Sequence, residues 1–179
     1  MADDTERLCR AVLERAGLEE GQVVLDFGCG SGNYSIPAAK IVKRTGKVYA
    51  VDRDSGKLKE LVGRMKREGL ENIETVGTGG ELEFPWEDGS VDTVLLYDIF
   101  WYFTIDDRRL PQLLAEAGRL LKPGGLLSVF PEHIAVEALA RKVEGAGFHP
   151  EGSFSCSLVH DGSKQQGRIL NFSKAAAVR

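Results

Sequence analysis

Three glycines at alternate positions, directly after an apolar run, form the stretch of this sequence best suited to hold a ligand. Residues 24–34 read Val-Leu-Asp-Phe-Gly-Cys-Gly-Ser-Gly-Asn-Tyr and lead into a helical pattern. Glycine permits a tight turn and lets a ligand approach bare backbone amides at the start of a helix. Asp52 ends the next apolar run, 20 residues beyond Gly32, where a carboxylate can accept hydrogen bonds from ribose hydroxyls. These spacings predict a site for a nucleotide-type ligand.

The glycine spacing then separates two such ligands. In a dinucleotide fingerprint the third glycine comes three positions after the second, so that a pyrophosphate sits on the helix N-terminus. Here Gly32 follows Gly30 by two positions, and Asp26 stands two residues ahead of Gly28. That carboxylate would repel a pyrophosphate but could hold an ammonium group. S-adenosylmethionine carries an ammonium group and no phosphate, so the pattern favours it over NAD and an NAD-dependent oxidoreductase. The alternative is that these glycines form a structural turn that binds no ligand.

The elements that must position these residues alternate along the chain. Apolar runs typical of strands covered on both faces lie at 22–27, 47–52, 72–76, 91–97 and 126–130. Helical spacing of apolar residues marks 5–16, 35–44, 55–68, 107–121 and 135–145. Strands that alternate with helices of this length predict a parallel sheet built from right-handed crossovers.

The end of the chain lacks this alternation. Two strand-like runs, 154–159 and 168–172, flank an Asp161-Gly162 turn signal with no helix between them, so we expect an antiparallel pair. The expected fold is α/β: a doubly wound, mostly parallel seven-stranded sheet with helices on both faces and an antiparallel C-terminal hairpin. We expect one Rossmann-like domain over 1–179, because single domains typically span ~100–200 residues. Its parts would be an N-terminal helix (1–20), a cofactor-binding core (21–130), and the last helix with the terminal hairpin (131–179).

Composition narrows the class of protein. The 179 residues carry 27 acidic and 23 basic side chains, a net charge of -4, which disfavours a nucleic-acid partner. No apolar stretch approaches the ~18–20 residues of a membrane span, and the N-terminus is acidic where a secretory signal is basic, so we expect a cytoplasmic protein with no membrane partner. Cys9, Cys29 and Cys156 lie far apart, which suggests neither a disulfide framework nor a metal site.

In combination these motifs resemble those of the class I, seven-stranded S-adenosylmethionine-dependent methyltransferases, and the small-molecule-type group most closely. The resemblance covers nearly the whole chain. It rests on the glycine motif 24–34, Val51-Asp52, the segment 84–92 before the fourth strand, and 120–125 before the fifth. The terminal hairpin also fits, since the family closes its sheet with an inserted seventh strand. The resemblance implies methyl transfer from S-adenosylmethionine to a small-molecule acceptor.

The resemblance implies residue roles at the methionine end of the cofactor. Asp26 and the backbone of Gly28, Cys29 and Gly30 would hold this end. Tyr34 would lie beside it. A different reading of the same fold is a non-catalytic S-adenosylmethionine-binding module.

Roles for the rest of the cofactor follow from the same resemblance. Asp52 would bind the ribose hydroxyls, and Arg53 would border the adenine. Thr78 and Gly79 would flank the adenine, while Tyr97 would contact the cofactor from the substrate side. Many family members have an Asp near the position of Thr78 that accepts a hydrogen bond from the adenine amino group. Here a hydroxyl or a backbone carbonyl would have to substitute.

The chemistry itself needs alignment more than acid–base groups, because the sulfonium already activates the methyl carbon. A general base is needed when the nucleophile is a hydroxyl or a protonated amine. Asp98, just beyond the strand 91–97, is the candidate base or substrate anchor, with capping of a turn as the alternative. Trp101 and Tyr102 are candidate pocket walls for an apolar or cationic acceptor, with packing in the core as the alternative. Phe100 and Phe103 are expected to pack in the core.

The amount of chain outside the core bears on how the pocket is closed. About 16 residues precede the first expected strand, and no long insertion follows the fifth. Because little chain is left to form a lid, we expect an open pocket, or one closed by a second subunit in a homodimer.

Overall fold

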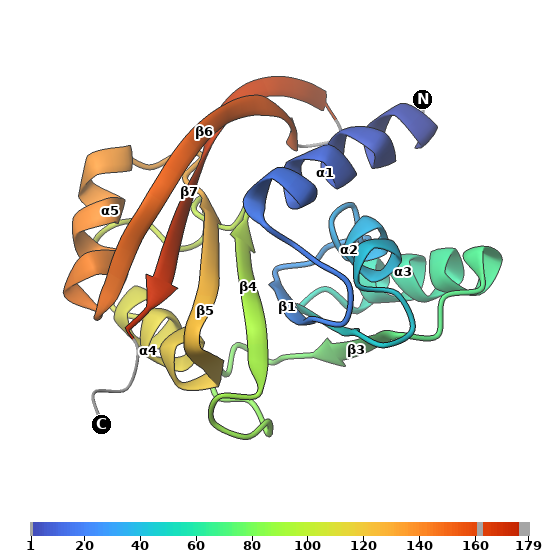
Figure 1. Ribbon diagram of the computed structural model, residues 1–179, viewed down its shortest axis with the longest axis horizontal. Helices are drawn as coiled ribbons and strands as arrows, with labels where there is room; N and C mark the ends of the chain where they lie inside the picture. The colour runs from blue at the N-terminus through green and yellow to red at the C-terminus, as the bar shows by residue number, and fades with distance from the viewer. Residues whose placement is uncertain (1, 161–162, 176–179) are drawn as a thin grey trace.

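A seven-stranded sheet in the order β3-β2-β1-β4-β5-β7-β6 forms the centre of the fold (Figure 1). The computed structural model describes residues 2–160 and 163–175. Its helices are α1 (Ala2–Ala16), α2 (Ser35–Val42), α3 (Ser55–Glu68), α4 (Leu110–Leu120) and α5 (Val136–Gly145). Its strands are β1 (Val23–Phe27), β2 (Lys47–Asp52), β3 (Ile73–Gly77), β4 (Val91–Tyr97), β5 (Leu121–Phe130), β6 (Phe148–His160) and β7 (Ser163–Lys174). Strands β1 to β5 pair in parallel and β7 runs antiparallel to β5 and β6, which confirms the expected fold class.

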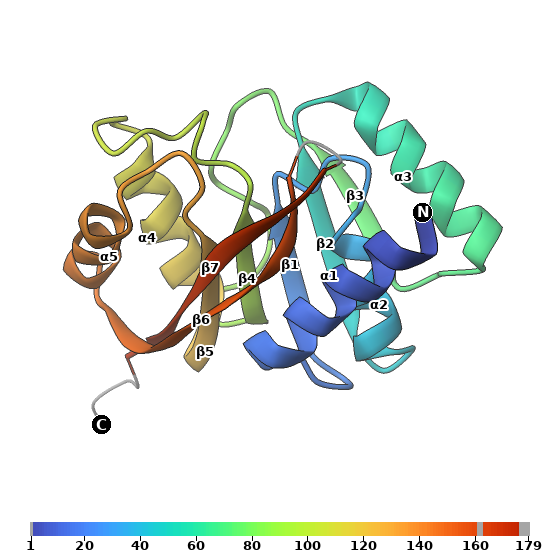
Figure 2. The same ribbon diagram turned by 90° about the horizontal axis from the view of Figure 1, so that it is seen from above.

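Helices cover both faces of this sheet because its central strands bury side chains on each side (Figure 2). One core cluster joins Leu25 and Leu96 of the sheet to side chains of α4 and α5. The other joins Val24 and Leu95, their neighbours in sequence, to side chains of α1, α2 and α3. Successive strand residues therefore point into opposite cores, as strand geometry requires.

Helix α1 begins at Ala2, three residues earlier than the sequence pattern indicated, and β5 and α4 also begin elsewhere than expected. Strand β5 begins at Leu121, which pairs with Val91 before the ladder shifts register and resumes at Thr93 and Leu126. The Lys-Pro-Gly-Gly stretch 122–125 forms this irregularity, and such turn-type residues concealed the start of the strand. Helix α4 begins only at Leu110, after a turn in which the Leu110 N–H donates to the carbonyl of residue 107.

The terminal hairpin is longer than predicted. Strand β7 pairs with β5 only over residues 170–173, while its pairing with β6 runs along the whole hairpin. The outer half curves over α1 (Figure 1), where Arg15 lies over the ring of Phe154 at 4.5 Å and donates to the carbonyl of Ser155. The expected turn at Asp161-Gly162 lies outside the described residues.

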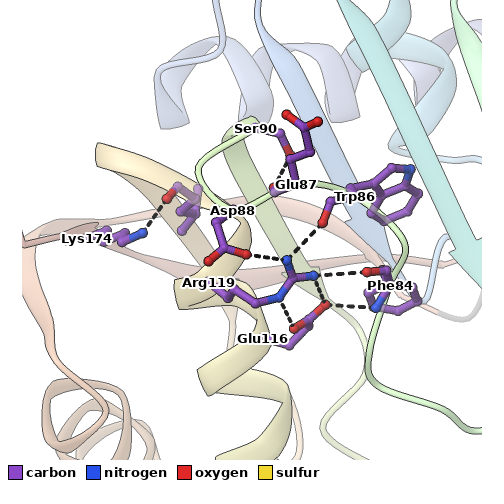
Figure 3. Close-up of polar contacts among 9 residues, drawn as sticks. Phe84, Trp86, Glu87, Asp88, Ser90, Glu116, Arg119 and Lys174 are labelled. Carbon is purple, nitrogen blue, oxygen red and sulfur yellow. Dashed lines mark hydrogen bonds and ion pairs between the residues drawn. The ribbon is translucent and has the colours of Figure 1, made fainter.

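Between β3 and β4 lies an irregular segment that Arg119 of α4 holds in place by hydrogen bonds and ion pairs (Figure 3). Arg119 donates to the carbonyl oxygens of Phe84 (3.0 Å) and Trp86 (2.9 Å) and pairs with Asp88 (2.7 Å) and Glu116 (2.6 Å). Burial would raise the pKa of Glu116, but the hydrogen bonds from Arg119 and the Phe84 N–H lower it overall. The anchored segment follows directly on the loop after β3, which borders the cavity described below.

Candidate functional site

A cavity of about 800 Å³ opens at the carboxyl ends of the central strands. Its walls are the loops that follow β1, β2, β3 and β4, together with Val159 of β6. Because β1 lies between β2 and β4, this is the point where the strand order reverses. Open α/β sheets bind their ligands at such switch points. The cavity therefore lies where the sequence motifs predicted a ligand site. Val159 is a lining residue that these motifs did not predict.

The conformation of the glycine loop after β1 requires residues without a side chain. Gly28, Gly30 and Gly32 all have positive φ, at 80°, 53° and 87°. A Cβ at Gly28 would clash with Ile99, and one at Gly32 would clash with Leu61. A Cβ at Gly30 would meet no heavy atom of the described residues within 4 Å, so this part of the loop leaves open space on the cavity wall. The backbone here can approach a ligand closely.

Asp26 lies in the cavity wall as a buried acid, with 2% of its surface exposed. Ser35 Oγ donates to its Oδ2 at 2.5 Å. Burial raises the pKa of Asp26 to about 6; the Ser35 hydrogen bond lowers it and the nearby Asp52 raises it. A carboxylate in this position is suited to a cationic partner, whose charge would offset the cost of burial.

Asp52 holds two loops together at the end of β2. Its Oδ2 accepts from the Gly30 N–H at 2.7 Å, and its Oδ1 accepts from the Asp54 N–H at 2.8 Å. Each carboxylate oxygen can accept about two hydrogen bonds, so both retain capacity for a ribose hydroxyl. The sequence indicated the ribose role but not this cross-link, which ties the glycine loop to β2.

The loop after β3 is organised by an acid that sequence reasoning missed. Glu81 Oε2 accepts from the Gly79 N–H at 2.6 Å and lies 3.1 Å from Thr78 Oγ1. Thr78 Oγ1 in turn accepts from the Gly80 N–H at 3.0 Å. All four of these residues line the cavity. The signal in the sequence was an acid three positions after Thr78, in a loop otherwise made of glycine.

Tyr97 and Tyr34 form the inner wall on the side of β4. Their rings meet edge to face at 4.8 Å. Ser128 Oγ donates to Asn171 and therefore accepts from the Tyr97 hydroxyl at 2.7 Å, so that hydroxyl is committed to the core. Burial raises the pKa of both tyrosines. Tyr97 can thus offer a ligand its ring, but its hydroxyl already has a partner.

The loop after β4 carries the expected acceptor-side residues. Asp98 lines the cavity with a positive φ of 58°, a conformation that Asp tolerates better than most residues. Trp101 and Tyr102 also line the cavity, with 53% and 38% of their surfaces exposed and ring centroids 3.6 Å apart. Phe100 and Phe103 are buried at 1% and 8% exposure, which confirms their expected place in the core.

Two arginines hold this loop from either side. The Arg53 guanidinium lies 4.2 Å from the centre of the Tyr102 ring and thereby joins the loop after β2 to the loop after β4 across the cavity mouth. Arg109 donates to the Tyr102 carbonyl at 3.2 Å and pairs with Asp107 at 2.6 Å. The hydrogen bonds that the Asp107 carboxylate accepts from the side chain and backbone N–H of Arg109 lower the pKa of Asp107 to about 2.

Among residues 2–160 and 163–175, no group of three or more His, Cys, Asp or Glu side chains is arranged to hold a metal ion. No helix there has the length and apolar character needed to cross a membrane.

A doubly wound sheet with a short glycine loop and a buried acid at its switch point defines the class I, S-adenosylmethionine-dependent methyltransferase fold. Residues 24–125, more than half of the chain, match the family model described as a methyltransferase domain. The chain therefore belongs to the methyltransferase-domain family.

Individual relatives give finer comparisons. The demethylmenaquinone methyltransferase of Staphylococcus aureus (strain MRSA252) is 34% identical over 118 residues, which are 66% of this chain and 46% of that protein. The chain thus matches a little under half the length of this relative. An S-adenosylmethionine-dependent methyltransferase from Aquifex aeolicus superposes with a TM-score of 0.74 at 22% identity, covering 97% of this chain and 98% of that one. The [4+2]-cyclase SpnF superposes at 0.76 with 17% identity, covering 96% and 81%. At such identities the two structures show the fold alone.

Proposed function

We propose that this protein transfers a methyl group from S-adenosylmethionine to a small-molecule acceptor with an apolar ring. The proposal rests on one cavity with two unlike sides: Asp26 of β1 and Asp52 of β2 beside the glycine loop on one side, and the exposed rings of Trp101 and Tyr102 on the other. Its volume falls within the ~300–1,000 Å³ typical of small-molecule sites. The name of the Staphylococcus aureus relative indicates a quinone-type acceptor for that protein, which supports this class of acceptor.

The acidic side fits the methyl donor. Asp26 would pair with the ammonium group, and the open backbone at Gly30 would lie against the methionine portion. Asp52 would accept from the ribose hydroxyls with the capacity that its two loop contacts leave. When bound, the donor supplies a methyl group already activated by a positive sulfonium. The chain's own task is to orient it and exclude water.

The aromatic side fits the acceptor. Trp101 and Tyr102 would hold a flat apolar ring and keep water from the reacting centre. Asp98 would accept the proton of an acceptor hydroxyl, or fix that hydroxyl in line with the methyl group. Asp98, Trp101 and Tyr102 all border the same cavity, so an acid and two rings would face the acceptor together.

The proposal includes a cytoplasmic location. Cys9 and Cys29 are buried thiols, a state that a reducing compartment maintains. Fractionation of cells that express the chain at native level, followed by immunodetection, tests this point. Recovery with membranes or in the culture medium would contradict it.

The function is tested by the fate of a labelled methyl group. Purified protein is incubated with methyl-labelled S-adenosylmethionine and, separately, a hydroxynaphthoquinol, a catechol, a glutamine-rich peptide and transfer RNA. We expect label in the organic extract of a ring acceptor and none in peptide or RNA. Label in peptide or RNA would refute the small-molecule acceptor, and donor binding without transfer to any acceptor would favour a binding module.

A further inference from the structure

Among the described residues, three cationic side chains line the cavity, and they differ in whether a carboxylate of the chain neutralises them. Lys57 pairs with Glu60 at 3.5 Å, and Arg109 pairs with Asp107 at 2.6 Å. The guanidinium of Arg53 forms no ion pair within residues 2–160 and 163–175, and its contact there is with an aromatic ring. Its positive charge is therefore left for a ligand of opposite charge.

The two acids that flank Arg53 in the sequence are bound to backbone groups instead. The Asp52 carboxylate accepts from the N–H groups of Gly30 and Asp54 at 2.7 and 2.8 Å. The Asp54 Oδ1 accepts from the N–H groups of residues 56 and 57 at 2.8 and 3.1 Å, where it caps α3. Neither carboxylate is paired with the guanidinium, although both are its close neighbours in the chain.

An aromatic ring holds the Arg53 guanidinium at the cavity mouth. Its central carbon lies 4.2 Å from the centre of the Tyr102 ring, and the Trp101 ring lies 3.6 Å from the same centre. Two groups so close to one ring centre cannot share a face, so the Tyr102 ring lies between Trp101 and Arg53. A guanidinium that covers a ring face keeps its N–H groups for hydrogen bonds, and their fork matches the two oxygens of a carboxylate.

The place of this guanidinium indicates which ligand it meets. In the proposed function the methionine portion of the donor lies at Asp26 and Gly30, after β1. Arg53 is instead turned toward the exposed rings of the acceptor side, across the cavity mouth. The acids of the donor side would repel an anionic group, so such a group is favoured only beside those rings.

We propose that the acceptor is a hydroxylated aromatic acid whose carboxylate binds the N–H groups of Arg53 while its ring lies against the rings of the acceptor side. The carboxylate serves as an anchor, and the hydroxyl that receives the methyl group lies toward Asp98. Arg53 is then a specificity-determining residue that favours anionic acceptors over neutral ones of the same shape. The inference deepens the proposed function and rests on its transfer of a methyl group to a ring acceptor.

The test compares protocatechuate, a catechol with one carboxylate, with its neutral carboxamide as acceptors of a labelled methyl group. For the unaltered protein we expect kcat/KM to be about ten-fold higher for the acid, the usual scale for hydrogen bonds between charged groups. The difference should lie mainly in KM, because an anchoring contact is made equally before and during the reaction. Arg53→Gln removes the charge and the fork, so it should abolish this preference mainly by raising KM for the acid.

Two controls separate recognition of the acceptor from other effects. Arg108→Gln removes the same charge from an exposed arginine outside the cavity lining and should leave the preference for the acid unchanged. Calorimetry with S-adenosylhomocysteine should give the same affinity for Arg53→Gln as for the unaltered protein. A loss of that affinity, with equal loss of transfer to both acceptors, would overturn the proposal because it would assign Arg53 to the donor.

The remaining outcomes distinguish this inference from the proposed function. Equal kcat/KM for the acid and the carboxamide in the unaltered protein, or a preference that survives Arg53→Gln, would overturn the inference and leave the proposed function standing. Transfer to the hydroxynaphthoquinol with none to protocatechuate would do the same. Absence of transfer to every ring acceptor would refute the proposed function, and this inference with it.

Discussion

The two sides of the cavity are built by different kinds of contact. On the donor side, hydrogen bonds at Asp52 join the loops after β1, β2 and β3: its carboxylate accepts from Gly30 and Asp54, and its carbonyl accepts from the Thr78 N–H. Within the loop after β3, Glu81 accepts from the Gly79 N–H.

On the acceptor side, the loop after β4 is held by a tilted contact between the Trp101 and Tyr102 rings and by the guanidinium groups of Arg53 and Arg109, and both rings are exposed. From these contacts we expect the donor side to be fixed before a ligand arrives and the acceptor side to adjust to its substrate. This difference predicts that substitutions on one side leave the other side's function intact.

The largest expected effect comes from Asp98 on the acceptor side. Asp98→Asn keeps the positive φ, since Asn also tolerates it, but cannot accept a proton. If Asp98 is the base, kcat for a hydroxyl acceptor should fall ~10²–10⁴-fold, while the affinity for S-adenosylhomocysteine stays within about two-fold. Single-turnover transfer and calorimetry measure the two quantities. A comparable loss of both would place Asp98 on the donor side.

The opposite pattern is expected for Asp52. Asp52→Ala removes the ribose contacts and frees the Gly30 and Asp54 amides, so cofactor affinity should fall by about 2–3 kcal/mol, close to a hundred-fold. Asp54→Ala is the matched control, because it removes only the cap of α3 and should lower the stability of the fold with little change in affinity. Unchanged cofactor binding in Asp52→Ala would remove the ribose assignment.

Asp26 should affect the affinity for the cofactor, the free energy of unfolding, and the dependence of that free energy on pH. Its carboxyl has a pKa of about 6 in the folded protein against 3.8 ordinarily, so the unliganded fold binds this proton more tightly than the unfolded chain does. The group therefore adds stability as the pH falls from about 6 toward 4 and costs stability at neutral pH. Asp26→Asn should raise the free energy of unfolding at pH 7 by roughly 2–3 kcal/mol, and most of this gain should vanish at pH 4.5.

Urea unfolding of both proteins at the two pH values measures the Asp26 effect, and calorimetry should show weaker binding of S-adenosylmethionine to the variant. A stability difference that does not change with pH would show that Asp26 does not titrate in this window. Stronger binding by the variant would contradict the ammonium contact.

The smallest effect is expected at the contact between Arg53 and Tyr102. Tyr102→Leu removes the ring that the Arg53 guanidinium covers, so the contact across the cavity mouth should lose about 0.5–1 kcal/mol. The dissociation rate of S-adenosylhomocysteine should then rise a few-fold. Tyr102→Phe keeps a ring and should dissociate at the original rate. Equal rates in all three proteins, measured by stopped flow, would show that the mouth is not held by this contact.

The sequence was informative where function demands a backbone conformation. Gly28 and Gly32 must lack a side chain, and Asp52 must end a strand. The spacing of these residues along the sequence was therefore enough to predict the donor side of the cavity. Glu81 and Val159 enter the cavity through loop geometry and hairpin curvature that no periodicity encodes. The start of β5 was hidden because Pro123 and Gly124, usually turn residues, form an irregularity within a strand. The roles of Asp98 and Tyr102 stay predictions.

Calorimetric titration of the purified protein with S-adenosylmethionine, S-adenosylhomocysteine and NAD decides whether this cavity is built for S-adenosylmethionine. A fixed donor side with a buried acid predicts micromolar binding of the first two ligands and no heat with NAD, whose pyrophosphate Asp26 would repel. Binding of NAD, or of none of the three, would contradict the account of this cavity.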